Sequence, residues 1–304
     1  MKLAAIDIGS NAARLLISDV TENEKGKPEF TKLNLLRVPL RLGFDVFEKG
    51  EISRQRVLML LRTMKAFGFL IKAYEIKHVK ACATSAMRDA RNSEEIIKKV
   101  KLETGIDIQI ISGEEEAAIV YENHIAENLT KDNAYLYIDV GGGSTELSFF
   151  ADGKLKYKES INIGTIRLLK NMVDDDQWNA FREKVKANIK SKLPVVAIGS
   201  GGNINKVFSI SKRKDGKPLT LQLLKDYYKE LSSFSVQERV RVYKMKDDRA
   251  DVIVPALQIY VNVMRWADIE EIYVPKIGVA DGLIQNLYEE VSMIGKRGIG
   301  KLGN

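Results

Sequence analysis

The sequence has few of the residues that usually mark thiol or soft-metal chemistry. It contains one cysteine, Cys82, and two histidines, His78 and His124, among 304 residues. One cysteine excludes an internal disulfide framework, and two distant histidines leave little for a zinc site. Cys82 falls within an apolar stretch, where a small buried residue is more common than a nucleophile. The chemistry that remains is that of carboxylates, hydroxyls, glycine-rich backbone and arginines.

Long apolar runs are also missing. No stretch approaches the roughly 20 residues that a bilayer-spanning helix needs, and the start MKLAAIDIGSN turns polar too early for a signal peptide. We therefore expect a cytoplasmic protein with no membrane partner. The length suggests two domains, 1–124 and 125–304, with a last helix at about 281–304 that can pack back on the first domain.

The charge is only moderately basic, at +7. Basic residues cluster at Lys212-Arg213-Lys214, with Lys217 nearby, and in the glycine-rich tail from Lys296 to Lys301. These clusters are either a solvated loop and terminus or a positive rim that attracts an anionic substrate. Nothing in the pattern indicates a specific nucleic-acid partner.

Apolar spacing predicts alternating strands and helices, which favours an α/β fold over a helical bundle. The expected strands are 2–8, 12–20, 30–42, 79–84, 106–111, 135–139, 146–150, 155–163, 195–198 and 271–274. The expected helices are 53–74, 92–104, one from Glu114, 175–192, three within 220–266, and one from about Asp281.

An internal repeat carries the most information. Ile6-Asp7-Ile8-Gly9-Ser10-Asn11 and Ile138-Asp139-Val140-Gly141-Gly142-Gly143 each bring Asp-x-Gly from a strand into a turn, and a second strand follows each turn. The repetition predicts two copies of one domain design. A third glycine turn, Gly199-Ser200-Gly201-Gly202-Asn203, follows another strand, and glycine turns at strand ends mark binding crevices in α/β proteins.

The turns suit a phosphate group. Glycine lets successive backbone N–H groups approach an anion closely, and Ser10, Asn11, Ser144 and Thr145 add side-chain donors. The alternative is an ordinary β-hairpin turn. Asp7 and Asp139 end apolar strands, so their carboxylates could hold Mg²⁺ or could simply bond their own turns.

Three other features could take part in hydrolysis. Glu114-Glu115-Glu116 open a helix, where a carboxylate could orient water or merely favour the helix dipole. Glu146 lies just past the 141–143 turn and could reach a metal or the water. Arg88 is either a phosphoryl clamp or a surface partner of Asp89.

Taken in order, the motifs resemble those of the exopolyphosphatase / guanosine pentaphosphate phosphohydrolase family. The matching segments are AIDIGSN at 5–11, ATSAMRDA at 83–90, ISGEEEA at 111–117, IDVGGGSTE at 138–146, AIGSGGN at 197–203 and RAD at 249–251. The likeness is to a short, two-domain form without the C-terminal His-Asp region of longer members.

The resemblance implies two actin-like (ribonuclease H-like) domains with the active site in a cleft between them, and Mg²⁺-dependent removal of a terminal phosphate, with K⁺ as a further activator. Glu115 is the implied catalytic carboxylate, with Glu116 one residue away as the alternative. Arg249 is placed on the substrate path. Arg88 and Glu146 complete the catalytic set; Asp7, Asp139 and Glu146 are the metal-side acids; and phosphate is held by Gly9, Ser10, Asn11, Gly141, Gly142, Gly143, Ser144, Thr145, Gly201 and Gly202.

The main functional hypothesis is an exopolyphosphatase, with guanosine pentaphosphate 5′-phosphohydrolase as the alternative. A slow polyphosphate or nucleotide sensor would need neither Glu115 nor Glu146, and a kinase-like transferase would use ATP. The charge excess in residues 125–304 and the lack of an obvious purine motif favour polyphosphate. A homodimer is also expected.

Overall fold

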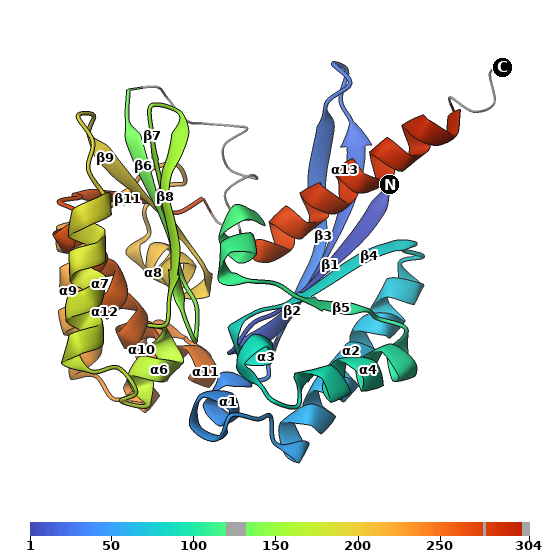
Figure 1. The fold of residues 1–304 in the computed structure, drawn as a ribbon, viewed down its shortest axis with the longest axis horizontal. Helices are drawn as coiled ribbons and strands as arrows, with labels where there is room; N and C mark the ends of the chain where they lie inside the picture. The colour runs from blue at the N-terminus through green and yellow to red at the C-terminus, as the bar shows by residue number, and fades with distance from the viewer. Residues whose placement is uncertain (120–131, 276–277, 300–304) are drawn as a thin grey trace. The chain divides into compact units, whose positions relative to one another are not determined.

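The computed structural model describes residues 1–119, 132–275 and 278–299, and they form two compact units (Figure 1). The first unit contains Met1–Ser112 and the C-terminal segment from Val279, and the second contains Gly113–Gly278. The sequence-based boundary between 124 and 125 lies outside the described residues. Across the described ranges, no helix is long and apolar enough to span a membrane.

The first unit is built on a five-stranded sheet with the order β3-β2-β1-β4-β5. Its strands are β1 (Lys2–Ile8), β2 (Ala12–Glu22), β3 (Pro28–Pro39), β4 (His78–Ala83) and β5 (Ile108–Ile110). Its helices are α1 (Gly43–Lys49), α2 (Arg54–Ala73), α3 (Ser85–Asp89), α4 (Ser93–Thr104) and α13 (Val279–Ile299).

The second unit has a six-stranded sheet with the order β10-β11-β9-β6-β7-β8. Its strands are β6 (Ala134–Val140), β7 (Thr145–Ala151), β8 (Lys154–Ile161), β9 (Val195–Ser200), β10 (Leu219–Thr220) and β11 (Glu271–Tyr273). Its helices are α6 (Thr165–Leu169), α7 (Asp175–Asn188), α8 (Gly202–Ser211), α9 (Leu221–Ser233), α10 (Val236–Tyr243), α11 (Asp247–Ala250) and α12 (Ile253–Trp266), and residues 113–119 are also helical.

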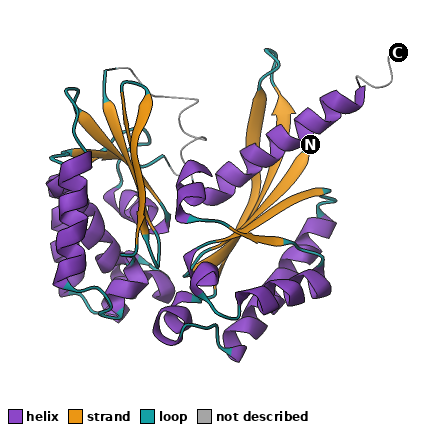
Figure 2. Ribbon diagram, viewed as in Figure 1, coloured by secondary structure: helices purple, strands orange, loops and turns teal. Residues whose placement is uncertain are grey.

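Strand pairing shows that the two units repeat one topology (Figure 2). In the first, β1 pairs antiparallel with β2, β2 antiparallel with β3, and β1 and β5 pair parallel with β4. Strands β6, β7, β8, β9 and β11 take the corresponding places and senses in the second. The α/β class and the internal repeat predicted from the sequence are therefore confirmed.

The repeat extends to the hydrogen bonds around the two Asp-x-Gly turns. Gly9 N–H donates to Ala12 O at 3.0 Å, and Gly141 N–H donates to Ser144 O at 2.9 Å. One residue after each glycine, the turn carbonyl accepts a bond from the start of a short helix: Ser10 O from Gly43 of α1, and Gly142 O from Ile166 of α6. Each turn is thus hydrogen-bonded to the helix that follows the third strand of its unit.

Local signals explain several helix boundaries. Asp174 and Gln177 form a capping box at the start of α7, and Ser235 and Glu238 form one at α10, so N-terminal N–H groups are satisfied locally. Gly105 adopts the left-handed conformation that ends α4. The sequence pattern missed α1, α3, α6, α8 and the two-residue strand β10. It also extended the third strand to 42, whereas β3 ends at Pro39.

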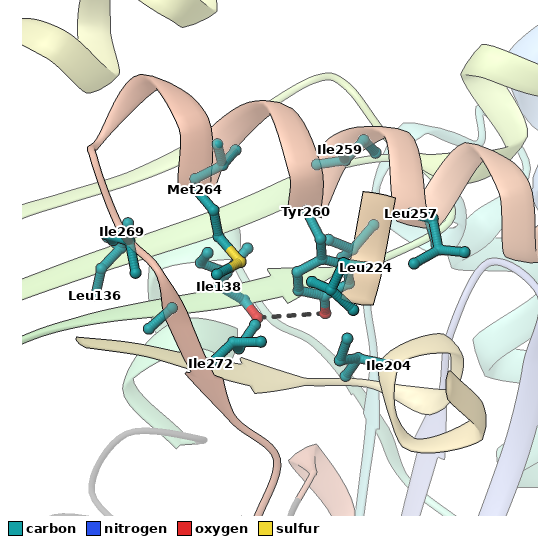
Figure 3. Packing of buried hydrophobic residues seen from close by; sticks show 14 of the residues in the cluster. Leu136, Ile138, Ile204, Leu224, Leu257, Ile259, Tyr260, Met264, Ile269 and Ile272 are labelled. Atoms are coloured by element: carbon teal, nitrogen blue, oxygen red, sulfur yellow. Dashed lines mark hydrogen bonds between the residues drawn. The ribbon is translucent and has the colours of Figure 1, made fainter. Parts of the chain in front are cut away.

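The core of the second unit lies between its sheet and α12. Leu136 and Ile138 of β6 and Tyr260 and Met264 of α12 are all at most 1% exposed (Figure 3). The Tyr260 hydroxyl donates to Ser200 O at 2.5 Å and lies 3.4 Å from Ile138 O. Helix α12 therefore holds the carboxyl ends of β6 and β9 through one buried hydroxyl.

Candidate active site

A row of polar side chains crosses four neighbouring strands of the second unit. Pairing places Glu146 of β7 opposite both Ser160 of β8 and Asp139 of β6, and Asp139 is also opposite Ser200 of β9. Because side chains alternate along a strand, Asp139 lies on the sheet face opposite the one that carries Ile138 into the main core. Asp139, Glu146, Ser160 and Ser200 therefore lie side by side across the sheet, near the carboxyl ends of β6 and β9.

Glu146 is 3% exposed, and its carboxylate is held by two hydroxyls. Ser144 Oγ donates to Glu146 Oε1 at 2.6 Å, and Ser160 Oγ donates to the same oxygen at 2.8 Å. A buried charge needs such partners, since an unbonded carboxylate in this position would carry a large desolvation cost. The two donors fix the direction of the carboxylate.

In the turn between β6 and β7, the carbonyl groups are hydrogen-bonded to the protein and several N–H groups are not bonded to any described residue. Gly141 O and Gly142 O accept bonds from the N–H groups of Thr165 and Ile166 at 3.0 and 2.8 Å, and Gly143 O accepts one from Arg167 Nε at 2.8 Å. Within the part of the chain that the structure describes, the N–H groups of Gly142, Gly143 and Ser144 donate to no protein acceptor. Successive unpaired N–H groups form an anion-binding nest.

Several of the expected phosphate donors already have partners within the protein. The Ser144 hydroxyl serves Glu146, the Thr145 hydroxyl donates to Ile163 O at 2.6 Å, and the N–H groups of Gly9 and Gly141 close their own turns. A buried hydroxyl or amide must find a partner inside the protein, so these groups are directed inward. In this turn the backbone of residues 142–144, and not the neighbouring hydroxyls, is left for an anion.

The 199–203 turn lies beside Asp139. Gly201 has φ +100°, and a Cβ there would lie 2.9 Å from Asp139 Oδ1. A Cβ on Gly202 would lie 2.7 Å from Nη1 of Arg249, so this guanidinium covers the first turn of α8. Lys206, one helical turn further, donates to Tyr243 O at 3.0 Å; burial, and then the charge of Arg249, lower the pKa of the Lys206 ammonium. The structure thus brings Asp139, Gly201, Gly202 and Arg249 together.

The helical segment 113–119 begins against Glu146. A Cβ on Gly113 would lie 3.4 Å from Glu146 Oε1. Glu115 is exposed, whereas Glu116 is half-buried and Ala117 is buried. Positions three and four residues after Gly113 share its helix face, so Glu116 is on the side that faces the sheet.

The first unit carries the remaining predicted residues. Asp7 is 3% exposed, and its Oδ2 accepts a bond from Arg14 Nη1 at 2.5 Å. Ser10 Oγ and Ser85 Oγ share a 2.7 Å hydrogen bond, and Arg88 Nη1 donates to Ile111 O at 2.8 Å. Arg14 occupies, opposite Asp7, the register position that Glu146 occupies opposite Asp139. The Asp7 carboxylate is therefore paired with a cationic side chain, and its expected role as a metal ligand stays a prediction.

The acids of the second unit fit Mg²⁺ as a minimal site. Asp139 and Glu146 are opposed on adjacent strands. Among the described residues there is no cluster of three or more His, Cys, Asp or Glu side chains that could hold a metal, so these two acids would be the protein's ligands. Magnesium in phosphate-handling sites commonly uses one or two carboxylates, with substrate oxygens and waters completing its shell. Two opposed carboxylates beside an anion nest meet that requirement.

Sequence analysis missed the residues that support this site. A Cβ on Gly164 would lie 2.5 Å from Gly142 O, so only glycine allows α6 to approach the turn. Tyr260 is buried beneath Ser200, and burial, followed by the charge of Asp139, raises the pKa of its hydroxyl well above 10. Neither residue lies in a glycine or acidic motif. The Gly-Thr pair at 164–165 was the one available signal, as a helix start.

The fold and this turn define an α/β protein with an actin-like repeat and a glycine turn whose N–H groups are not bonded to the described residues. Residues 19–290 match the model of the Ppx/GppA phosphatase family. The chain is 26% identical to exopolyphosphatase 1 of Mycobacterium bovis, with 93% of this chain and 87% of that protein covered. It is 24% identical to the guanosine-5′-triphosphate,3′-diphosphate pyrophosphatase of Vibrio vulnificus, covering 95% of this chain and 59% of that one.

A solved structure of the Ppx/GppA family member from Aquifex aeolicus is similar with a TM-score of 0.73 and 26% identity, covering 95% of this chain and 98% of that one. The family match spans most of the sequence. The chain belongs to the Ppx/GppA phosphatase family, and it is a phosphatase that hydrolyses phosphoanhydride bonds.

Proposed function

We propose that this protein is an exopolyphosphatase, which releases terminal phosphate from inorganic polyphosphate, with guanosine pentaphosphate as the alternative substrate. The carrying observation is the turn at 141–144, whose carbonyls are bonded to the protein while three N–H groups are not. This arrangement supports binding of phosphoryl oxygens beside two opposed carboxylates. Related proteins named for each substrate keep both candidates open.

In the proposed mechanism, the N–H groups of 142–144 bind equatorial oxygens of the terminal phosphoryl group and favour the charge that it carries in the transition state. Asp139 and Glu146 would hold Mg²⁺, which supplies further charge neutralisation when bound. Arg249, above the first turn of α8, would contact the part of the substrate beyond the terminal phosphate. The roles of Arg88 and the 9–11 turn stay predictions of the resemblance.

A glutamate of helix 113–119 would orient the attacking water. Glu116 is half-buried and lies on the same helix face as Gly113, which is beside Glu146. This position favours Glu116 over the exposed Glu115 for this role. A carboxylate that is partly shielded from solvent and held near a second acid is better placed to act as a general base. Glu115, which the motif position suggested, is then the solvent-facing neighbour.

Polyphosphate is favoured by the exposed basic loop. Lys212, Arg213, Lys214 and Lys217 are all exposed and follow the C-terminal end of α8, whose first turn lies under Arg249. A helix of ten residues spans about 15 Å, so a linear polyanion could contact both ends. A nucleotide would gain little from the loop.

The test is phosphate release from long polyphosphate, guanosine pentaphosphate and ATP, measured at fixed Mg²⁺ over increasing KCl above a constant K⁺ floor. We expect the highest kcat/KM on polyphosphate, with a steep fall as salt rises. The triple variant Lys212→Ala/Arg213→Ala/Lys214→Ala should lose efficiency on long chains and not on short ones. Efficient nucleotide hydrolysis beside weak, length-independent action on polyphosphate would favour the alternative, and transfer from ATP would favour a kinase.

Two further expectations belong to this proposal: a cytoplasmic location and a homodimer. A sensor that binds without turnover is the rival, and it predicts no phosphate release from any of the three compounds. The opposed acids beside the nest support the enzyme, because binding an anion alone would be opposed by two carboxylates.

A further inference from the structure

We propose that Ser160 is a positioning residue for the reaction: it holds the Glu146 carboxylate and packs against Gly113, where the helix with the candidate glutamates begins. This inference rests on the proposed function, since it gives a role to a residue that acts through Glu146. Ser160 lies in no motif that the sequence singled out. Only its register on β8, opposite Glu146, brings the two side chains together.

The hydrogen bonds define the orientation of Glu146. Its Oε1 accepts from Ser144, two residues earlier, and from Ser160, on the neighbouring strand. Hydrogen bonds to an ionised oxygen are stronger than those between neutral groups. Ser144 stands just before β7, and Ser160 stands on the neighbouring strand β8, so rotation of the carboxylate would break at least one of the two bonds. Of the two donors, Ser160 is the one on a neighbouring strand.

The second contact joins Ser160 to Gly113. A Cβ on Gly113 would lie 2.4 Å from Ser160 Oγ and 2.5 Å from Ser160 Cβ, distances that no real Cβ tolerates. The backbone at the start of helix 113–119 therefore rests on the Ser160 side chain. One serine thus touches both the acid of β7 and the first residue of the helix that carries Glu115 and Glu116. Ser160 thereby sets the distance between the Glu146 carboxylate and the start of helix 113–119.

Ser148 provides a matched control for Ser160. It is 3% exposed and lies two residues after Glu146, on the same face of β7, where it is paired with Lys158 of β8. Each Ser→Ala change removes one hydroxyl from the same sheet face. We expect Ser160→Ala to lower kcat by roughly 10-fold or more and to raise the Mg²⁺ concentration for half-maximal rate, as for other residues that orient a metal ligand. The KM for polyphosphate should change by less than about twofold, and Ser148→Ala should change neither constant by more than that.

A binding readout independent of turnover is the rise in Tm that Mg²⁺ produces, which reports ligand affinity for the folded state. This rise should be smaller in Ser160→Ala than in the wild type or in Ser148→Ala. If the wild type releases phosphate from none of the three compounds, the proposed function fails, whereas the Tm comparison still judges the role of Ser160.

A second pair of variants separates packing from positioning. Gly113→Ala should lower Tm, because its new Cβ meets Ser160. Adding Ser160→Gly removes both contacting atoms, so the double variant should recover Tm but not kcat, since the hydroxyl is gone. Recovery of kcat together with Tm would overturn the proposal, as would equal kcat and Mg²⁺ dependence in Ser160→Ala and Ser148→Ala.

Discussion

At the scale of single residues, the two repeats differ in the side chain that faces the aspartate of the central strand. Asp7 and Asp139 each stand one residue before the end of their strand, β1 and β6, but Asp7 faces Arg14 and Asp139 faces Glu146. A buried aspartate beside a guanidinium is satisfied as an ion pair, whereas two opposed carboxylates repel one another until a cation or a proton intervenes. The same fold thus places an ion pair in one unit and two opposed acids in the other.

The residue-scale prediction concerns the water-orienting glutamate. Glu116→Gln should lower kcat by about 10²–10⁴-fold with little change in KM, because an amide can occupy the same space but cannot accept a proton. Steady-state phosphate release measures both constants. Glu115→Gln is the matched control one residue away on the exposed side, and it should retain turnover near that of the wild type. The reverse result would return the role to Glu115.

At the scale of elements, two short helices govern the turns although neither has a strong sequence pattern. Helix α6 has five residues. The N–H groups of Thr165 and Ile166 bond the carbonyls of Gly141 and Gly142, and the Arg167 side chain bonds that of Gly143. In the first unit α1 bonds the turn in the same way, through Gly43 N–H and Ser10 O. The first N–H groups of a helix have no acceptor within the helix, and the turn carbonyls supply acceptors for two of them. This exchange rotates the peptide units so that the N–H groups of the turn point away from the helix.

The element-scale prediction is made at Gly164, the N-cap of α6. Gly164→Ala would place a Cβ 2.5 Å from the carbonyl oxygen of Gly142, so backbone must move on one side or the other. We expect a loss of both kcat and Tm, measured by phosphate release and thermal unfolding. Gly68→Ala, where a Cβ meets no atom within 4 Å and the glycine lies inside α2, is the control. It should raise stability by roughly 0.5–1 kcal/mol, so a gain at both positions would contradict this account of Gly164.

At the scale of the whole molecule, the first unit is completed by the end of the chain. Helix α13 packs on β1, β2 and β4, and it carries ion pairs from Asp281 to Lys32 and from Glu290 to Lys80 (Figure 1). Leu283 and Ile284 are at most 2% exposed. The first unit is therefore discontinuous in sequence, while the second runs from Gly113 to Gly278 without interruption.

The prediction at this scale is that the last helix contributes to the stability of the first unit. Leu283→Ala should lower the free energy of unfolding by about 2–5 kcal/mol, as expected for a fully buried leucine. Met293, 62% exposed on the same helix, is the control, and Met293→Ala should stay within about 0.5 kcal/mol. Denaturant unfolding measures both. Equal, small effects would show that α13 is only loosely attached.

The sequence by itself determined the fold class, the repeat and the position of each glycine turn. These follow from local signals: apolar periodicity sets strands and helices, and glycine marks turns where N–H groups can approach an anion. The order of the motifs also carried the family. Short elements such as α6, with five residues, escaped because so few residues show no clear period.

Only the tertiary structure decided which polar groups remain for a ligand. The hydroxyls of Ser144 and Thr145 look like donors to phosphate, yet both are used within the protein. Register across strands brought Ser160 to Glu146 and Arg14 to Asp7, and the helix face separated Glu116 from Glu115. These partners lie on neighbouring strands, 7 and 14 residues apart in the chain. The reason is physical: a buried polar group must be satisfied by whichever group packing places beside it, and that neighbour is set by strand pairing and not by local sequence.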